Sequence, residues 1–266
     1  MTYAALKAAL QAAGVENFEG EARILLEEFA RATPADLCSG RDFSDARLTD
    51  ALARRQAHEP LQYILGKWAF YKEEYRVSPD CLIPRPDTEL LVETLLRRLP
   101  RGARFLDLCT GSGCIAISTA KHRPDVTALA ADLSDGALAL AKENAAANRV
   151  SSVGFRKLDV TMPSPLDERF DCIVSNPPYI RTDALGTLAP ELAFEPRMAL
   201  DGGDDGLRFY RAILEHFAAN RKDGGFFLFE FGFDQQEDAA ALAARHELSF
   251  EPLFDLGGNF RAAVMA

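Results

Sequence analysis

The 266-residue chain lacks several features that would place it in a specialised class of proteins. It has only five cysteines, which are widely spaced, so no complete disulfide framework is indicated and a reducing compartment is favoured. Its four histidines also stand far apart, and no set of Cys and His residues has the spacing of a zinc site. No apolar run is long enough to span a bilayer, and the first residues do not resemble a signal peptide. We therefore expect a cytoplasmic protein without a bound metal and without a membrane partner.

An excess of positive charge is missing as well. The chain has 30 Lys and Arg against 40 Asp and Glu, a net charge of −10. The balance is negative both in residues 1–80, with 10 basic against 13 acidic residues, and in the rest, with 20 against 27. Because binding to a phosphate backbone depends on clustered cations, we expect no direct contact with nucleic acid. The remaining composition, 48% hydrophobic and 26% charged, is that of an ordinary globular protein.

Residues 1–75 are predicted to form a small helical domain that ends in a hairpin. Leu6 and Leu10 recur at helical spacing, and Thr33 precedes Pro34 as an N-cap precedes a first-turn proline. Residues 61–77 are rich in aromatic and β-branched side chains, which is typical of a β-hairpin. Residues 76–86 contain three prolines and are predicted to be a linker. The helical domain is a candidate for substrate recognition.

Residues 87–266 are predicted to form an α/β domain, because short apolar runs alternate with helical stretches. The candidate strands are 104–108, 126–131, 153–157, 170–174 and 226–229, and the candidate helices include 87–99, 134–148, 207–219 and 235–246. Continuous apolar strands separated by helices indicate a doubly wound, mostly parallel sheet covered on both faces. No helix separates the last two runs, 250–253 and 260–265, so we expect the sheet to end in an antiparallel strand.

A glycine loop follows the first of these strands, in the sequence Asp107-Leu-Cys-Thr-Gly-Ser-Gly113. It has neither the G-x-G-x-x-G spacing of dinucleotide folds nor a G-K-[ST] for phosphates. Asp132 ends the next strand, where a carboxylate can hold ribose hydroxyls, and Asp159 follows the third. A structural turn and a helix-cap acid remain the simpler alternatives. A nucleoside cofactor without a pyrophosphate, such as S-adenosylmethionine, also fits the pattern. Its candidate binding residues are Cys109, Thr110, Gly111, Ser112, Gly113, Asp132, Asp159, Val160 and Asn176.

The most specific pattern is Asn176-Pro177-Pro178-Tyr179, directly after the fourth predicted strand. Prolines supply carbonyl acceptors without N–H donors, so the site offers the Asn176 side-chain oxygen and the Pro177 carbonyl, with an aromatic ring beside them. Such a site suits a planar –NH2 group, because two acceptors fix its protons and direct its lone pair at a methyl donor. We therefore predict Asn176, Pro177 and Tyr179 as catalytic and all four residues as substrate-binding. The alternative is a Pro-Pro turn with Tyr179 packed in the core.

With these motifs the sequence resembles class I S-adenosylmethionine methyltransferases, and more narrowly the protein-(glutamine-N5) methyltransferases that modify the Gly-Gly-Gln loop of peptide chain release factors. The resemblance covers nearly the whole chain. It is carried by residues 60–66, 82–89, 107–116, 174–180, 195–206, 230–235 and 255–261. Two positions depart from the family: Cys109 stands where many members have glycine, and Val160 where an aromatic residue is sometimes found over the adenine. The resemblance implies S-adenosylmethionine as the cofactor and release factors as protein partners.

Other classes of protein share parts of this pattern. A related family methylates glutamine in a ribosomal protein, but its linker usually lacks the Pro84-Arg85-Pro86 arrangement. A DNA adenine-N6 methyltransferase would use a similar tetrapeptide, but it needs a basic surface for the polyanion. An NAD-dependent oxidoreductase leaves the tetrapeptide without a role. A non-catalytic binding protein would be expected to lose either Asn176 or the glycine loop.

Overall fold

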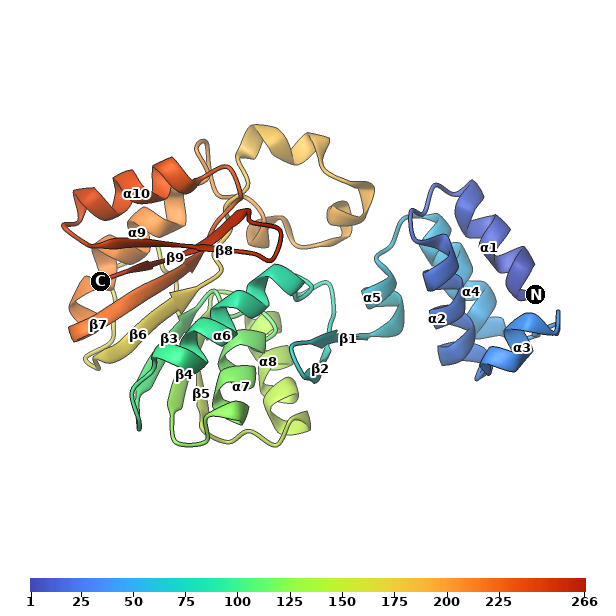
Figure 1. The fold of residues 1–266 in the computed structure, drawn as a ribbon, viewed down its shortest axis with the longest axis horizontal. Coiled ribbons are helices and arrows are strands. Elements are labelled where there is room, and N and C mark those ends of the chain that lie inside the picture. Colours follow the sequence, from blue (N-terminus) through green and yellow to red (C-terminus); the bar gives the residue numbers. More distant parts are fainter. The chain divides into compact units, whose positions relative to one another are not determined.

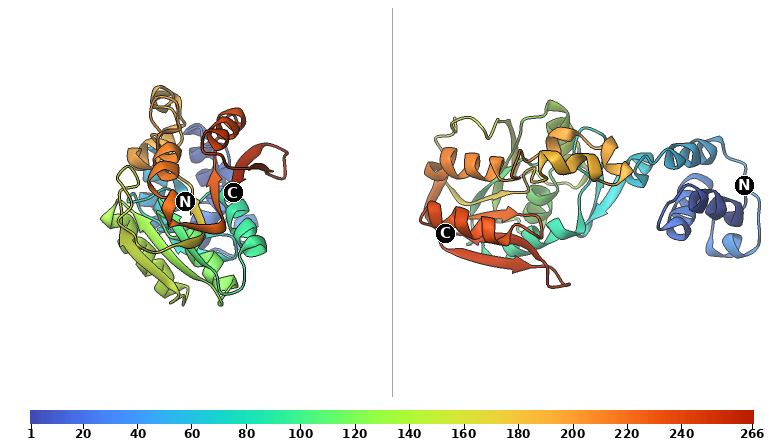
Figure 2. Two further views of the ribbon diagram at one scale, coloured as in Figure 1. Left: turned by 90° about the vertical axis from the view of Figure 1, so that its left-hand side faces the viewer. Right: turned by 90° about the horizontal axis from the view of Figure 1, so that it is seen from above.

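The computed structural model describes residues 1–266 and divides them into two compact units. The helical unit comprises Met1–Lys67 together with Ala189–Phe194. The second unit comprises Trp68–Leu188 together with Glu195–Ala266, and it is named the catalytic unit here because it contains the residues predicted to be catalytic. Figures 1 and 2 show the elements of each unit, which are described separately below.

Short helices packed on a small apolar core make up the helical unit. They are α1 (Tyr3–Ala12), α2 (Phe18–Ala30), α3 (Pro34–Cys38), α4 (Ala46–Gln56), α5 (Leu61–Leu65) and the 3-10 helix η3 (Pro190–Phe194). The predicted N-cap at Thr33 is confirmed, because its side chain accepts from the Asp36 N–H and the Asp36 carboxylate accepts from the Thr33 N–H. Leu6, Leu10 and Leu25 are completely buried, so the apolar stripes of the first two helices face inward.

The predicted hairpin over residues 61–77 is wrong in its first part. Leu61–Leu65 forms helix α5, and only β1 (Lys67–Phe70) and β2 (Glu73–Arg76) pair as strands. The helix ends at Gly66, which has a φ of 69°, a left-handed conformation that glycine adopts without steric cost. Of the aromatic residues that suggested strands, Tyr63 instead lies on this short helix, where it is 6% exposed.

The compact units also divide the chain at other positions than the predicted domain boundaries. The helical unit ends at Lys67 rather than at residue 75, and it includes residues from far along the sequence. Phe70 and Tyr75, from the two hairpin strands, are buried in the same core cluster as Leu91 and Phe105. The hairpin is therefore part of the catalytic unit.

A seven-stranded sheet forms the centre of the catalytic unit, with the order β5-β4-β3-β6-β7-β9-β8. The strands are β3 (Arg104–Leu108), β4 (Thr127–Asp132), β5 (Val153–Lys157), β6 (Phe170–Ser175), β7 (Arg221–Glu230), β8 (Phe250–Phe254) and β9 (Phe260–Met265). Pairing is parallel from β5 to β7, and β9 is antiparallel to both β7 and β8. This confirms the predicted mostly parallel sheet with an antiparallel end. Strand β7 begins five residues before the prediction, in the polar stretch from Arg221 that the apolar pattern could not reveal.

Helices cover both faces of the sheet (Figure 1). The helices that pack on the sheet are α6 (Glu89–Arg98), α7 (Cys114–His122), α8 (Asp135–Ala147), α9 (Arg208–His216) and α10 (Gln236–Arg245). The unit also contains the short 3-10 helices η1 (Pro86–Thr88), η2 (Thr182–Thr187), η4 (Arg197–Ala199) and η5 (Ala218–Asn220). One core cluster contains side chains of α6, α7 and α8, and a second contains side chains of α9 and α10. The chain order reverses between β3 and β6, which is where open α/β sheets bind ligands.

Candidate functional site

A cavity of about 480 Å³ lies beyond the carboxyl ends of β3, β4 and β6, and every residue that lines it belongs to the catalytic unit. Its volume is within the range of sites for small molecules and cofactors. The predicted residues that line it are Cys109, Thr110, Gly111, Ser112, Asp132, Asp159, Val160, Asn176 and Pro178. Gly113, Pro177 and Tyr179 were also predicted and are not part of the lining.

The glycine loop owes its shape to left-handed backbone conformations. Cys109, Gly111 and Gly113 have φ values of 57°, 53° and 82°. Cys109 therefore holds a conformation that favours glycine, which accounts for the glycine many family members have there. Gly113 has a packing role, because a Cβ there would lie 2.8 Å from Ile117 Cδ1 and 3.1 Å from Ala141 Cβ. The loop thus turns tightly between β3 and α7 while its backbone stays open to the cavity.

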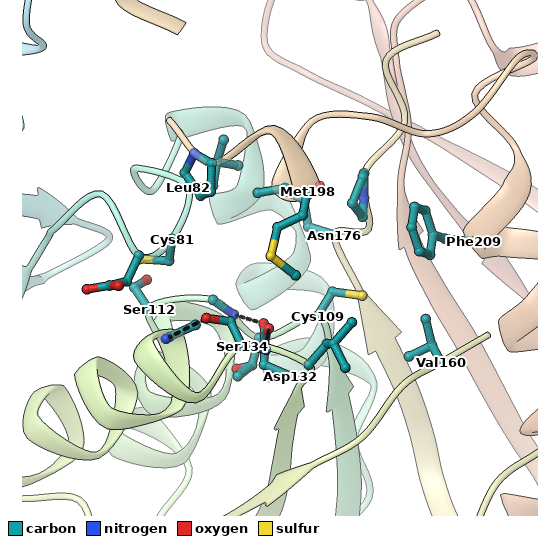
Figure 3. Close-up of a pocket in the computed structure, with 18 of the residues that line it drawn as sticks. Cys81, Leu82, Cys109, Ser112, Asp132, Ser134, Val160, Asn176, Met198 and Phe209 are labelled. Carbon is teal, nitrogen blue, oxygen red and sulfur yellow. Dashed lines mark hydrogen bonds between the residues drawn. The ribbon is translucent and has the colours of Figure 1, made fainter. Parts of the chain in front are cut away.

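Asp132 lies at the end of β4 on the cavity wall (Figure 3). Its Oδ2 accepts from the Gly111 N–H at 2.9 Å, and its Oδ1 accepts from the Ser134 N–H at 2.9 Å. Burial raises the pKa of this carboxyl group, and the two amide bonds oppose that shift. Each oxygen keeps a further lone pair, so the fixed carboxylate can accept two hydroxyl groups of a ribose.

Asn176 follows β6 and lines the cavity with one side of its amide already bound. Its Nδ2 donates to Thr88 Oγ1 at 3.1 Å, so the donor end points to Thr88 and the acceptor Oδ1 is left for a ligand. Thr88 is 2% exposed and comes from η1, at the end of the predicted linker. The strand ends are tied together here, because Ser175 Oγ donates to the Leu108 carbonyl at 2.6 Å. The sequence pattern had not identified Thr88.

The structure places Tyr179 mainly against the protein. It is half-buried and packs on the core cluster that contains Tyr210, and burial raises the pKa of its phenol. Gly202 fits tightly against it, since a Cβ there would lie 2.7 Å from Tyr179 Cα. Pro177 is buried and Pro178 lines the cavity. Of the four tetrapeptide residues, only Asn176 and Pro178 reach the cavity in this structure.

Asp159 and Val160 occupy the part of the cavity beyond β5. Asp159 Oδ1 accepts from the N–H and hydroxyl of Thr161 at 2.9 and 2.6 Å, and these bonds lower the pKa of its carboxyl group. Val160 offers a small apolar surface, and the ring of Phe209 lies on the same side of the cavity (Figure 3). An aromatic wall is therefore supplied by α9, a helix that the sequence pattern had not connected with the site.

Two further segments complete the cavity wall and were missed in the sequence. The predicted linker contributes Asp80, Cys81, Leu82, Pro84 and Arg85, and the segment after the tetrapeptide contributes Pro196, Arg197, Met198 and Ala199. The segments are joined by Glu195, which is 5% exposed, accepts from the Ile83 N–H at 3.0 Å and pairs with Arg85. The acid of Glu195-Pro-Arg and the basic residue of Pro-Arg-Pro were the only signal of this contact in the sequence.

Two buried carboxyl groups lie behind the site and form no ion pair within 4 Å, although the charge of Arg261 acts on Glu230. Asp107 Oδ2 accepts from Thr110 Oγ1 at 2.5 Å, but Asp107 Oδ1 and Glu230 Oε2 have no hydrogen-bond partner. Burial raises the pKa of each group to about 7, although interactions with Thr88 and Asn176 partly offset the shift at Glu230. Buried groups that titrate near neutral pH are typical of functional sites.

The structure contains no cluster of three or more His, Cys, Asp or Glu residues that could hold a metal ion. None of its helices has the length and apolar character needed to cross a membrane.

Comparison with known proteins first defines the class. Residues 86–201 match the model of the methyltransferase small domain, and residues 3–66 match the model of the PrmC N-terminal domain. Two solved structures share the fold. A methyltransferase from Pyrococcus furiosus has a TM-score of 0.54 and 19% identity, over 72% of this chain and 86% of that chain. A ribosomal protein L11 methylase from Lactobacillus delbrueckii has a TM-score of 0.50 and 20% sequence identity, over 68% of this chain and 79% of that chain. The catalytic unit is thus a methyltransferase domain.

Curated relatives define the family within that class. The release factor glutamine methyltransferase of Geobacter sulfurreducens is 45% identical over 73% of this chain and 68% of that protein. The release factor glutamine methyltransferase of Neisseria gonorrhoeae is 40% identical over 92% of this chain and 92% of that protein. That of Cereibacter sphaeroides is also 40% identical, over 97% of this chain and 95% of that protein. The chain belongs to the family of release factor glutamine methyltransferases.

Proposed function

We propose that this enzyme transfers a methyl group from S-adenosylmethionine to the side-chain amide nitrogen, N5, of the glutamine in the Gly-Gly-Gln loop of peptide chain release factors. The reaction would take place in the cytoplasm and serve translation termination. The observation that carries the proposal is the fixed amide of Asn176, which turns an acceptor oxygen toward a cavity suited to a nucleoside cofactor.

The cavity residues fit this cofactor by their chemistry. Asp132 offers a fixed carboxylate for the ribose, and residues Cys109–Ser112 line the cavity where the amino-acid end would be held. Val160 and Phe209 provide apolar surface for the adenine, beside Asp159. When bound, S-adenosylmethionine supplies an activated methyl group on a positively charged sulfur.

The chain's own groups would act on the acceptor amide. An amide nitrogen is a poor nucleophile because its lone pair is delocalised. Asn176 Oδ1 and the Pro177 carbonyl would each hold one N–H of the glutamine, with Tyr179 and Pro178 against the plane of the amide. Since Tyr179 packs largely on the protein and Pro177 is buried, their part requires the acceptor loop to enter beside them. Thr88 keeps the Asn176 amide in the productive orientation.

Incubation with radiolabelled S-adenosylmethionine and separate acceptors tests the proposal. A release factor should gain one methyl group on the glutamine of its Gly-Gly-Gln loop, detected by mass spectrometry, and replacing that glutamine with alanine should abolish labelling. Glycine neighbours have no Cβ, so such a loop can reach a narrow site. Labelling of DNA or of a ribosomal protein, with the release factor unlabelled, would refute the substrate while leaving the methyltransferase class intact.

A further inference from the structure

A loop leaves the sheet immediately after the tetrapeptide and returns to the cavity wall. Its base is closed by a bridge between Ile180 and Asp201, in which the Ile180 N–H donates to the Leu200 carbonyl at 3.0 Å and the Gly202 N–H donates to the Ile180 carbonyl at 2.7 Å. The base therefore starts one residue after Tyr179. A displacement of this loop, residues 180–201, would therefore shift the backbone next to the proposed acceptor site.

Two acidic residues in the returning part of this loop are held by different partners. Glu195 is fixed within the catalytic unit by the Ile83 N–H and Arg85. Glu191, four residues earlier, belongs to the segment that clusters with the helical unit. There its Oε1 accepts from Arg55 Nη2 at 3.1 Å, with His58 Nδ1 at 3.8 Å.

Arg55 is an unusual residue for a helix of this small unit, because it is only 5% exposed. Its Nε donates to Glu21 Oε2 at 2.6 Å, so one carboxylate already neutralises it inside the helical unit. A buried guanidinium needs such a partner, but the second carboxylate, Glu191, is not needed for neutrality. The Arg55–Glu191 bond instead restrains the far part of the loop.

We propose that Arg55 is a positioning residue for the acceptor protein: by binding Glu191, it fixes the loop that begins beside Tyr179. This inference rests on the proposed function. The cofactor wall formed by Pro196–Ala199 is held separately through Glu195, and the Asn176 amide is held by Thr88. Loss of the Arg55–Glu191 bond should therefore impair binding of the release factor rather than binding of the cofactor or the chemical step.

Glu191→Ala is the variant of choice, because Arg55 keeps Glu21 and the helical unit should remain folded. The matched control is Glu59→Ala, which removes a similar ion pair with Arg54 in the same unit; the side chains of Glu191 and Glu59 are 32% and 18% exposed. For Glu191→Ala we expect KM for the release factor to rise about tenfold, because an unrestrained loop must be ordered on binding. We expect kcat and the calorimetric Kd for S-adenosylmethionine to change less than about threefold, and Glu191→Gln, which keeps an acceptor oxygen, to recover most of the loss.

Hydrogen exchange supplies a readout that needs no acceptor. Amides of residues 182–194 should exchange faster in Glu191→Ala than in the wild type, and at the wild-type rate in Glu59→Ala. Unchanged exchange, equal KM values for Glu191→Ala and Glu59→Ala, a parallel loss of cofactor affinity, or no recovery by Glu191→Gln would each overturn the inference. A wild-type protein that binds S-adenosylmethionine but methylates no release factor would instead refute the proposed function, and the exchange comparison would still decide the role of Arg55.

Discussion

The buried charged group of the helical unit is paired, whereas two buried acids behind the cavity of the catalytic unit are not. In the helical unit, the buried guanidinium of Arg55 is bonded to two carboxylates, Glu21 and Glu191. In the catalytic unit, Asp107 and Glu230 are buried with one oxygen each left unpartnered, and neither forms an ion pair within 4 Å. Elsewhere in the catalytic unit the buried acids are paired, Glu195 with Arg85 and Glu73 with His122, so the unpaired acids belong to the surroundings of the cavity rather than to the unit as a whole. The difference teaches that the acids behind the cavity keep polar capacity that the protein's own groups do not use.

The strongest test of that contrast compares two asparagines of the catalytic unit, the half-buried Asn176 and the buried Asn220. Asn176 donates to one hydroxyl and keeps its oxygen for a ligand. Asn176→Ala should reduce turnover roughly a hundredfold or more, the usual effect of losing one preorganised contact to a transition state. Thermal stability should stay nearly unchanged, as measured by the midpoint of a melting curve alongside the methylation rate.

Asn220 is the matched control. It is 4% exposed, and its side-chain N–H groups donate to the Leu166 and Glu168 carbonyls at 2.9 and 2.8 Å. Asn220→Ala leaves these acceptors unpaired, so it should lower stability by about 1–3 kcal/mol and leave the turnover of the folded protein unchanged. If the activity of Asn176→Ala fell only in proportion to its loss of folded protein, Asn176 would be structural and the contrast would fail.

A smaller effect is expected on the affinity for the cofactor. Asp132→Ala removes the fixed carboxylate beside the glycine loop and should weaken binding of S-adenosylmethionine by about 1.5–3 kcal/mol, the scale of charge-assisted hydrogen bonds. Calorimetry measures this directly. Glu21→Gln in the helical unit is the comparison, because it weakens a buried ion pair with Arg55 and should lower the melting temperature without changing the cofactor Kd. Unchanged affinity in Asp132→Ala would move the ribose contact to another residue.

Much of the fold could be predicted from the sequence because local signals agreed with the tertiary structure. The ranges 104–108, 153–157 and 260–265 are strands with the predicted bounds. The first and last are largely buried in the core, whereas 153–157 is an edge strand in which only Val153 is buried. Prediction was wrong at residues 61–65, where aromatic side chains favoured strands but tertiary packing buried them on a helix. Composition alone could not distinguish these outcomes.

The site was predicted where its residues follow strands in the chain, and missed where they come together only in the fold. Asp132 and Asn176 stand at strand ends, so a parallel sheet brings them to one edge. Thr88 and Phe209 lie on a linker helix and on α9, and no spacing in the sequence connects them with Asn176. Long-range pairs such as Arg55–Glu191, 136 positions apart, were invisible for the same reason.

The smallest expected effect concerns pH. Burial raises the pKa of Asp107 and of Glu230 to about 7, from ordinary values of 3.8 and 4.5. The folded protein then holds protons that the unfolded chain has already lost, so stability is full below about pH 4 for these groups and declines as the pH rises toward 7. Exposed acids with lowered pKa values, such as Asp205 at about 2, act in the opposite direction but only below about pH 4. In the absence of cofactor we expect the melting temperature to fall between pH 5 and pH 8, by about 2–4 °C for each kcal/mol lost.

The fall should be smaller in Glu230→Gln, because that variant has no proton to lose, and unaltered in Glu74→Gln, whose exposed side chain lies outside the site. A positively charged ligand near these groups favours their ionised forms, so S-adenosylmethionine should reduce the fall more than its uncharged thioether product does. A fall of the same size in Glu230→Gln as in the wild type would contradict the raised pKa of Glu230, and with it the contrast between paired and unpaired buried acids.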